Sequence, residues 1–425
     1  MAEGALHGVR VLEFTQIVAG PYSCMLLSDM GAEVVKIEAP EGDNNRRSGS
    51  AVPGTAKAFQ WLNRGKKSLV LDVETDAGRE ALYRLVPQFD VFVTNYRANY
   101  TERYGIDYET LAKLNPKLVY ARVSGFGLQG PLADAQGIEL VLQAYSGIMA
   151  EEGRVDDFGA PRSSNTTWFV DVITGTTVAL GVVSALRHRD QTGEGQVIDA
   201  VLLRSAMAAI GQHIMQEPVA DAIIVGDAVQ DARQQILDGT AYGDVVRGYY
   251  AATHNQTNIP RPYFSGYTVK DGAIFLGTVT PRHRREASRI IGVEGSPTLE
   301  ERFDPKDPAD VARAAQVKQD VIANMRTRTM DEWLGELRAA GIPVAPVRFP
   351  PELADDPQAS QYMVELDDPM TGPQKQLRSV FDMSATPVHA GGPAPTLGQH
   401  TEQLLGAAGF TAEELARLRE AGATI

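Results

Sequence analysis

The stretch GVRVLEFTQIVAGPYSCMLLSDMGAEVVKIE, residues 8–38, predicts a strand, a helix and a second strand in immediate succession. Its ends, GVRVLEF and AEVVKIE, are short apolar runs, and PYSCMLLSDMG between them is typical of a helix that Gly31 ends. The alternation continues, with strands predicted at 66–73, 90–96 and 117–125 and helices at 76–88 and 106–114. Strands that alternate with helices predict an α/β fold, in which helices cover both faces of a parallel sheet.

Further along the chain the pattern changes. Residues 165–190 predict one long helix. Residues 216–262 are rich in Asp, Gln, Asn and Gly, which is typical of a linker or of active-site loops. The segment FSGYTVKDGAIFLGTV (264–279) predicts a hairpin, and helical patterns follow at 308–325 and 329–340. These later elements predict a second, smaller α/β unit.

Composition excludes several classes of partner. The formal net charge is −14, from 40 basic and 54 acidic residues, which argues against a nucleic-acid partner. A local basic cluster can still hold a small phosphorylated ligand. No apolar run is expected to approach the ~18 residues that a membrane span needs. Cys24 is the only cysteine and no secretory signal opens the sequence, so a reducing cytoplasm is expected.

Asp171 is the residue that stands out as a site candidate. It lies in the apolar helical segment WFVDVI (168–173), where an unpaired carboxylate would be costly to bury. It is therefore either a paired or cleft-facing structural aspartate or a functional carboxylate. Gly175 lies one turn further on the same helix face, and its missing side chain leaves room for something to approach Asp171.

Other motifs carry weaker signals. The GxGxxG at 125–130 is followed at once by Pro131 and opens no clear helix, so it does not favour a dinucleotide site. No two histidines have metal-ligand spacing, so no metal site is predicted. Seven basic residues gather around two of the predicted strands, where they form either a solvated face or a phosphate site: Arg46, Arg47, Arg64, Lys66, Lys67, Arg97 and Arg103.

Taken together, the motifs resemble the class III CoA-transferases, which include formyl-CoA and carnitine CoA-transferases and, as relatives, α-methylacyl-CoA racemases. The resemblance covers nearly the whole chain except about 216–262. It rests on the order and spacing of segments that are individually ordinary: 6–38, NRGKKSLVLDV (63–73), VTNYR (93–97), LNPKLVYARVSGFGLQGP (114–131), 189–200, GIPVAPV (341–347) and LGQHTE (397–402).

The resemblance implies an architecture. It implies a Rossmann-like large domain with a parallel sheet, formed by residues 1–215 and completed by 345–425. Residues 216–262 would then be a linker and active-site loops, and 263–344 a smaller α/β domain. It also implies an interlocked homodimer, in which each subunit is an open ring threaded through the other.

The resemblance also implies site residues. Asp171 matches the covalent nucleophile of the family. The segment that contains Gln16, Val18 and Ala19 matches the backbone that lines the catalytic pocket, and Ile138 and Glu139 match further pocket positions. The expected CoA-binding residues are Leu71, Asn95, Tyr96, Arg97 and Arg103.

The activity so implied is transfer of CoA from an acyl-CoA thioester to a small free carboxylic acid. The reaction would pass through a mixed anhydride and an aspartyl-CoA thioester, with CoA as a substrate and with no metal or redox cofactor. Two alternatives stay open: an acyl-CoA isomerase on the same fold, and a non-catalytic acyl-CoA-binding protein. The racemases carry a histidine at the position of Ile138, and a side chain that cannot titrate does not favour epimerisation.

Overall fold

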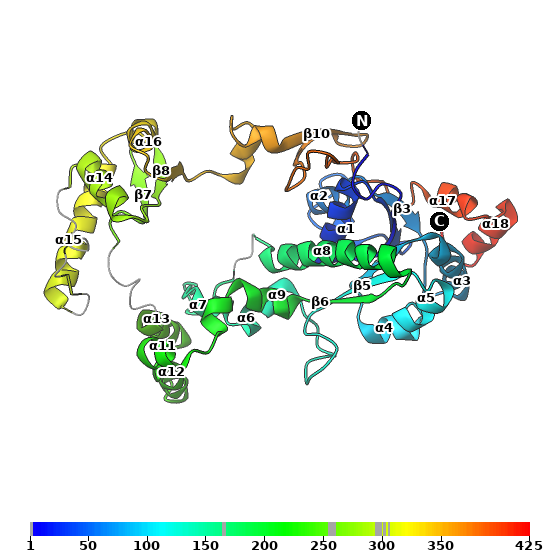
Figure 1. Ribbon diagram of the computed structural model, residues 1–425, viewed down its shortest axis with the longest axis horizontal. Helices are drawn as coiled ribbons and strands as arrows, with labels where there is room; N and C mark the ends of the chain where they lie inside the picture. Colours follow the sequence, from blue (N-terminus) through cyan, green and yellow to red (C-terminus); the bar gives the residue numbers. More distant parts are fainter. Residues whose placement is uncertain (1–2, 164–166, 254–260, 294–299, 301–302, 305–306) are drawn as a thin grey trace. The chain divides into compact units, whose positions relative to one another are not determined.

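The computed structural model describes residues 3–163, 167–253, 261–293, 300, 303–304 and 307–425 (Figure 1). The chain divides into two compact units. The large unit contains Met1–Met149, Ser163–Met215 and Pro357–Ile425, and the small unit contains Ala150–Arg162 and Gln216–Asp356. Each unit has a sheet and a hydrophobic core of its own.

A six-stranded parallel sheet is the centre of the large unit, as the alternating pattern predicts. The strands lie in the order β3-β2-β1-β4-β5-β6. Their order reverses between β1 and β4, and in open α/β sheets ligands bind beyond the carboxyl ends of the strands at such a point. The strands are β1 (Arg10–Phe14), β2 (Glu33–Glu38), β3 (Lys67–Val70), β4 (Val91–Thr94), β5 (Val119–Ser124) and β6 (Val197–Val201).

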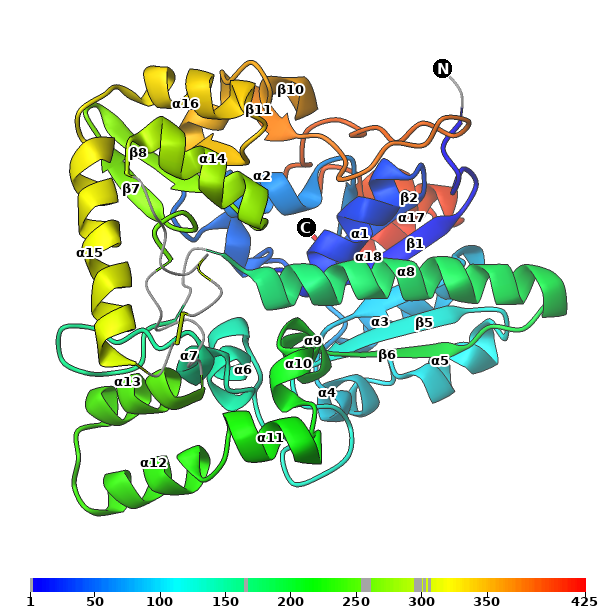
Figure 2. The ribbon, with the colours of Figure 1, turned by 60° about the vertical axis from the view of Figure 1, so that its left-hand side comes forward.

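Successive strand residues point to opposite faces of the sheet and enter two separate cores. On one face, Val11 and Val91 pack with α1 (Ala19–Asp29) and α8 (Phe169–Thr192). On the other, Leu12 and Phe92 pack with residues of α3 (Asp76–Leu85), α5 (Tyr108–Leu114), α17 (Thr401–Ala407) and α18 (Ala412–Glu420). Figure 2 shows α8 running alongside β5 and β6, with α5 on the side opposite to it.

The C-terminal segment completes the large unit at the edge strand β3. The hydroxyl of Thr401 accepts a hydrogen bond from Val70 N at 3.0 Å, and the Thr424 hydroxyl donates to Val70 O at 2.7 Å.

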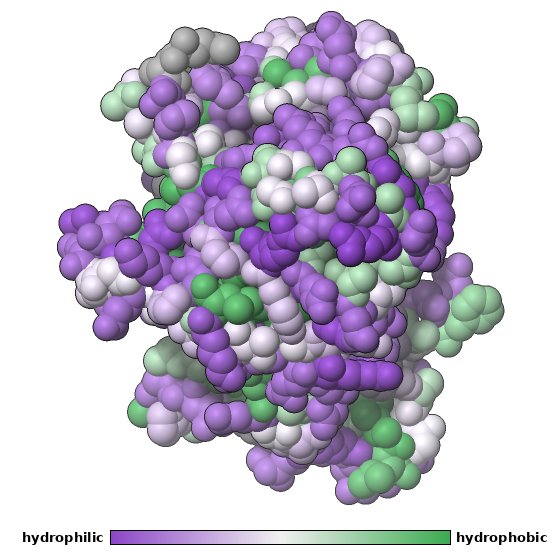
Figure 3. All heavy atoms as spheres, turned by 90° about the vertical axis from the view of Figure 1, so that its right-hand side faces the viewer, coloured by the Kyte–Doolittle hydropathy of each residue, from purple (hydrophilic) through white to green (hydrophobic). Residues whose placement is uncertain are grey.

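Hydrophilic side chains predominate on the side of the molecule seen in Figure 3. The remaining elements of this unit are α2 (Lys57–Asn63), α4 (Ala98–Arg103), α6 (Glu139–Tyr145), α9 (Leu202–Ala209), α10 (Gly211–Ile214) and the hairpin β10 (Met363–Asp368) with β11 (Gly372–Leu377); α7 (Ile148–Glu151) lies at the boundary between the units.

Helix α8 corrects one expectation. It is long enough to cross a membrane, and its most apolar 18-residue window has a mean hydropathy of 1.8. Glycine, serine and threonine interrupt its apolar residues and Asp171 is the one charged residue among them, so the helix does reach the ~18 residues that were expected to be absent. Half of that window is buried inside the protein, where Val178 and Val182 are fully enclosed, so α8 is a central core helix of the large unit.

The small unit contains a three-stranded antiparallel sheet and three helices that pack around Trp333. The hairpin predicted at 264–279 is present, with its turn at Lys270 and Asp271. The indole of Trp333 is 2% exposed and donates to Met325 O at 2.9 Å. The elements are β7 (Gly266–Val269), β8 (Gly272–Leu276), β9 (Val344–Pro346), α14 (Pro281–Ile291), α15 (Pro308–Met325) and α16 (Met330–Ala339).

Residues 216–262 are not the linker and loops that their polar composition suggested. Their described part, 216–253 and 261–262, contains the helices α11 (Pro218–Ile224), α12 (Ala228–Leu237) and α13 (Tyr242–Thr253). Pro218 at the first helical position and the Glu217 carboxylate that accepts from Ala220 N favour the start of α11. Most residues of α12 are Ala, Gln, Arg or Leu, and all four favour helices although Gln and Arg are polar.

Candidate active site

The segment after β1 is held in place by two asparagine side chains. The amide of Asn95, which follows β4, accepts from Gln16 N at 2.9 Å and donates to Gln16 O at 2.6 Å. The amide of Asn45 donates to Ile17 O at 2.5 Å. Both functional groups of Asn95 are therefore engaged with the backbone of the segment at the switch point of the sheet.

Ile17 has a strained backbone. Its φ is +69°, and it is the only non-glycine residue with a positive φ in the described part of the chain. A β-branched residue in this region costs on the order of 1–3 kcal/mol and persists only where its surroundings fix it. The bonds from Asn45 and Asn95 fix this turn, which leads into α1.

Two buried lysines fix both ends of the same segment. Lys36 Nζ donates to Thr15 O at 2.8 Å and lies 3.0 Å from Glu13 Oε1. Lys66 Nζ donates to Pro21 O at 2.9 Å and lies 2.7 Å from Glu13 Oε2. Burial alone would raise the pKa of Glu13, but the two ammonium groups outweigh it and lower that pKa below its ordinary value. The ionised Glu13 thus joins the two lysines that hold the segment.

Most of the basic residues before β3 are neither a solvated face nor a phosphate site. Arg46 pairs with Glu38 and Arg64 with Asp29, each at 2.6 Å, and all four side chains are buried. Lys66 is fully enclosed beside Glu13. These three basic side chains can be buried because each is paired with a buried carboxylate. The local sequence does not reveal these partners.

Asp171 lies in the first turn of α8, and Glu139 holds that turn. Glu139 Oε2 accepts from Asp171 N at 2.7 Å, and Oε1 accepts from Val170 N at 3.2 Å. The side chain of Gln143 also donates to Glu139 Oε1, at 2.7 Å. The first N–H groups of a helix have no partner within the helix, so Glu139 satisfies two donors that would otherwise be unpaired.

The same arrangement changes the ionisation of Asp171, which is only 7% exposed. Burial raises its pKa to about 7, and the negative charge of Glu139 contributes to the rise. A carboxylate with a pKa near 7 is present in both ionisation states at neutral pH, which is typical of functional carboxylates.

Gly175 permits a close helix contact one turn after Asp171. A Cβ atom there would lie 2.6 Å from Ala19 O and 3.0 Å from Tyr22 Cδ1. The room that the missing side chain leaves is therefore occupied by α1. The contact places the start of α1 against the helix that carries Asp171.

The other residues from the sequence analysis lie in varied surroundings. Val18 and Ala19 are buried at the start of α1, and Leu71 is buried in the core on the opposite face of the sheet. Ile138 is 61% exposed, immediately before Glu139. The ring of Tyr96 stacks on Phe14 and on Tyr100, with ring centroids 4.3 and 4.9 Å away. Arg97 and Arg103 are exposed, and the Arg103 guanidinium lies over the Tyr104 ring.

Sequence reasoning missed Asn45, Tyr22, Trp61 and Trp168. Asn45 is one of several polar residues in and around a short 3-10 helix (Asn44–Arg46), and only the fold brings it to Ile17. Tyr22, Trp61 and Trp168 come from separate segments, and no sequence periodicity indicates that their rings lie together.

Within the described residues, no group of three or more His, Cys, Asp and Glu side chains could hold a metal ion.

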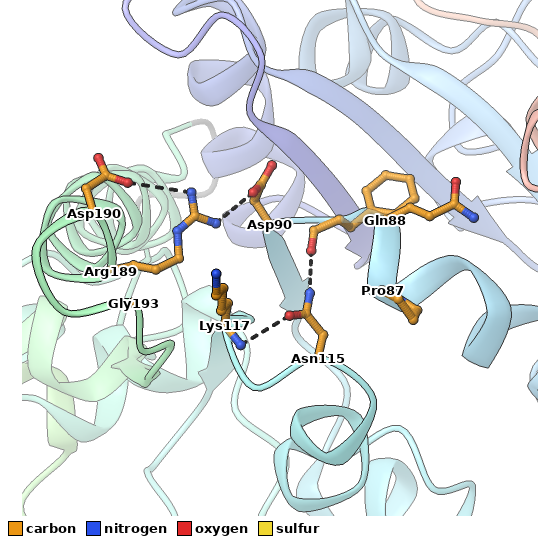
Figure 4. A pocket seen from close by; sticks show the side chains of 9 residues that line it. Pro87, Gln88, Asp90, Asn115, Lys117, Arg189, Asp190 and Gly193 are labelled. Carbon is orange, nitrogen blue, oxygen red and sulfur yellow. Dashed lines mark hydrogen bonds and ion pairs between the residues drawn. The ribbon is translucent and has the colours of Figure 1, made fainter.

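One hollow of about 400 Å³ lies at the amino ends of strands β4 and β5 (Figure 4). Arg189 crosses it, with its guanidinium 2.7 Å from Asp90 and 3.8 Å from Asp190. The second oxygen of Asp90 accepts from Arg10 N at 2.8 Å. Asp90 precedes β4, whereas Asn95 follows it. The hollow with its Arg189–Asp90 ion pair therefore lies at the amino ends of the strands, and the strained segment at Ile17 lies at their carboxyl ends.

Comparison with known proteins identifies the family of the chain. The profile of CoA-transferase family III matches residues 6–401. The chain is 31% identical to the succinate–glutarate CoA-transferase of Agrobacterium fabrum, over 94% of each chain. It is 32% identical to the succinyl-CoA:mesaconate CoA-transferase of Haloarcula marismortui, over 96% of this chain and 97% of the other.

Solved structures show the same fold. A CAIB/BAIF family protein from Brucella suis superposes with a TM-score of 0.74 at 27% identity, covering 96% of this chain and 100% of that one. The family profile and the relatives establish the class of the enzyme. The chain belongs to family III of the CoA-transferases.

Proposed function

We propose that the enzyme transfers CoA from an acyl-CoA thioester to a small carboxylic acid through covalent intermediates on Asp171. The observation that carries the proposal is the position of Asp171, a buried carboxylate with a raised pKa in the first turn of α8. The names of the relatives, which include succinate, glutarate and mesaconate, support a small carboxylic acid as the acceptor.

The first half of the reaction consumes the donor. An ionised oxygen of Asp171 attacks the thioester carbonyl carbon, the carbon–sulfur bond breaks, and CoA leaves as a thiolate. The product is a mixed anhydride between the acyl group and Asp171. The thiolate then attacks the Asp171 carbonyl carbon and expels the first acid as a carboxylate, which leaves an aspartyl-CoA thioester.

The second half repeats these steps in reverse with the acceptor. The acceptor carboxylate attacks the aspartyl thioester, the thiolate leaves, and a second mixed anhydride forms. Attack of the thiolate on the acceptor's acyl carbon yields the new acyl-CoA and restores the Asp171 carboxylate. Each step exchanges one anion for another, so the cycle needs no net proton transfer.

Backbone N–H groups at the start of α1 are suited to stabilise the tetrahedral oxyanions of these steps. No side chain caps the start of α1, so the N–H groups of Ala19 and Gly20 donate to no capping side chain. The contact of Ala19 O with Gly175 keeps them close to the helix that carries Asp171. The strained turn at Ile17 sets their direction.

The finer features implied by the resemblance belong to the same proposal. We propose a Rossmann-like CoA-binding domain, CoA contacts from Leu71, Asn95, Tyr96, Arg97 and Arg103, and pocket contacts from Gln16, Val18, Ala19, Ile138 and Glu139. An interlocked homodimer, a cytoplasmic location and the lack of any cofactor, with CoA as a substrate, complete the proposal.

Trapping tests the covalent route. The protein is incubated with succinyl-CoA and hydroxylamine, digested, and examined by mass spectrometry. The expected product is a hydroxamate on Asp171. The absence of a hydroxamate, combined with Asp171-dependent α-proton exchange of a 2-methylacyl-CoA in heavy water, would support an isomerase instead. No covalent product and no exchange would support a binding protein.

A further inference from the structure

Three aromatic side chains from separate elements contact one another beside the start of α8. Tyr22 of α1 and Trp61 of α2 have ring centroids 5.8 Å apart at an interplanar angle of 50°. Trp61 and Trp168, which directly precedes α8, lie 6.1 Å apart at 23°. We call Tyr22, Trp61 and Trp168 the aromatic arc.

The aromatic arc is anchored next to Asp171. Tyr22 Cδ1 lies 3.0 Å from the position of a Cβ atom on Gly175, one turn after Asp171 on the same helix face. Trp168, at the other end of the arc, comes three residues before Asp171. Tyr22 therefore contacts α8 one turn after the proposed nucleophile, and Trp168 directly precedes the first turn that carries it.

Exposure increases along the aromatic arc. Tyr22 is 5% exposed, Trp61 is partly buried, and Trp168 is 38% exposed. Core packing explains Tyr22, which belongs to the core between α1, α8 and the sheet. It explains less of Trp168, whose ring stays partly exposed at the start of the helix that carries the buried Asp171.

We propose that the aromatic arc forms the wall of the acyl-group subsite and excludes water from the acyl group while it is attached to Asp171. This proposal rests on the covalent route of the preceding section. Flat apolar rings fit an alkyl or planar unsaturated chain, which can lie against them without losing a hydrogen bond. The arc thus favours acyl groups with an apolar segment next to the reacting carbonyl.

The reaction that the aromatic arc suppresses is hydrolysis. Water would attack the acyl carbonyl carbon of the mixed anhydride, and the bond to the Asp171 oxygen would break. The products are the free acid and the restored Asp171, both ionised, and two protons go to solvent. CoA, already expelled as thiolate, would then be lost, so the enzyme would act as a thioesterase. Excluding water from a reactive intermediate prevents this side reaction.

The test compares hydrolysis with transfer in Trp168→Ala. Succinyl-CoA is the donor. Hydrolysis is measured as release of free CoA, and transfer as formation of the CoA thioester of glutarate or mesaconate when that acid is added. We expect the ratio of hydrolysis to transfer to rise roughly tenfold or more, since losing an apolar contact of this kind changes discrimination by about 10–200-fold. The preference for butyryl-CoA over acetyl-CoA as donor should fall in the same variant.

Two further variants separate this role from a structural one. Trp168→Phe keeps a flat ring and should restore the wild-type ratio. Phe158→Ala removes a ring that is 95% exposed in the small unit and should leave the ratio unchanged. Thermal melting of each variant checks that it is folded.

Other outcomes would overturn the proposal. A folded Trp168→Ala variant with the wild-type hydrolysis ratio and the wild-type donor preference would show that the aromatic arc only packs the helix end, while the covalent route would stand. Wild-type protein that forms no covalent product on Asp171 would remove the covalent route and the role of the arc together.

Discussion

The Glu139 carboxylate accepts a 2.7 Å hydrogen bond from the backbone N–H of Asp171. One side chain therefore fixes the position of the proposed nucleophile and also brings negative charge to it. Burial is the main cause of the raised pKa of Asp171, about 7, and Glu139 is the second cause. A more basic carboxylate is a better nucleophile once ionised, so this pairing makes the reaction depend on pH near neutrality.

The wild-type enzyme should lose activity below neutral pH. Only the ionised form of Asp171 can attack the thioester, so kcat/KM should fall about tenfold per pH unit below a pKa of about 7 and level off above it. The measurement is a pH–rate profile with a saturating acceptor. A flat profile between about pH 5.5 and 8 would contradict the assignment, since these limits bracket the pKa of Asp171.

Glu139→Gln should move this profile toward lower pH. Glutamine keeps an oxygen that can accept from the N–H of Asp171 but removes the negative charge that raises its pKa. Because burial is the larger cause, the acid limb should remain above the range of an ordinary aspartate. The exposed Glu109 on α5 provides the control, and Glu109→Gln should leave the profile in place.

Asp171→Asn should abolish transfer and stabilise the protein at alkaline pH. The pKa of Asp171 is raised on folding, so the native state holds a proton that the unfolded state releases, and stability falls as pH rises from about 4 to about 7. A shift from 3.8 to about 7 sets an upper bound of about 4 kcal/mol on this penalty. Asparagine removes the penalty.

The measurement is thermal melting of the wild type and Asp171→Asn at two pH values. The variant should melt at a higher temperature at about pH 8, and the difference should shrink at about pH 4, where the wild-type carboxyl is also neutral in the folded protein. An equal difference at both pH values would show that the effect comes from packing.

The sheet could be predicted from sequence because its strands are apolar runs separated by helices. The run 90–96 contains β4, and 117–125 contains β5, with their parallel pairing. The surroundings of the site could not be predicted in this way. Lys36, Lys66 and Glu13 come from three strands or strand ends, and only tertiary packing decides that they are buried together. Glu139 and Asp171 were named by the resemblance, but their hydrogen bond follows from the packing of α6 against α8.

Asn95→Ala should lower kcat more than it raises KM for acyl-CoA. The Asn95 amide bonds both backbone groups of Gln16, so its loss frees the strained turn at Ile17. We expect a loss of about 1–3 kcal/mol in the free energy of unfolding. A rise in KM with kcat unchanged would indicate instead that Asn95 acts mainly as a CoA contact. Asn45→Ala, which frees the Ile17 carbonyl alone, should have a smaller effect of the same kind.

Gly175→Ala should damage both stability and activity. The added Cβ would lie 2.6 Å from Ala19 O, a distance that requires the backbone of α1 to move away from α8. Overpacking of this kind costs roughly 1–3 kcal/mol, which exceeds the gain of about 0.5–1 kcal/mol from replacing glycine in a helix. The displaced start of α1 should also lower kcat.

Gly335→Ala on α16 is the matched control, because a Cβ there meets nothing within 4 Å, and it should be neutral or stabilising. Chemical unfolding and steady-state kinetics of both variants measure the difference, and a Gly175→Ala protein as stable and active as the control would show that the contact between α1 and α8 does not position the site.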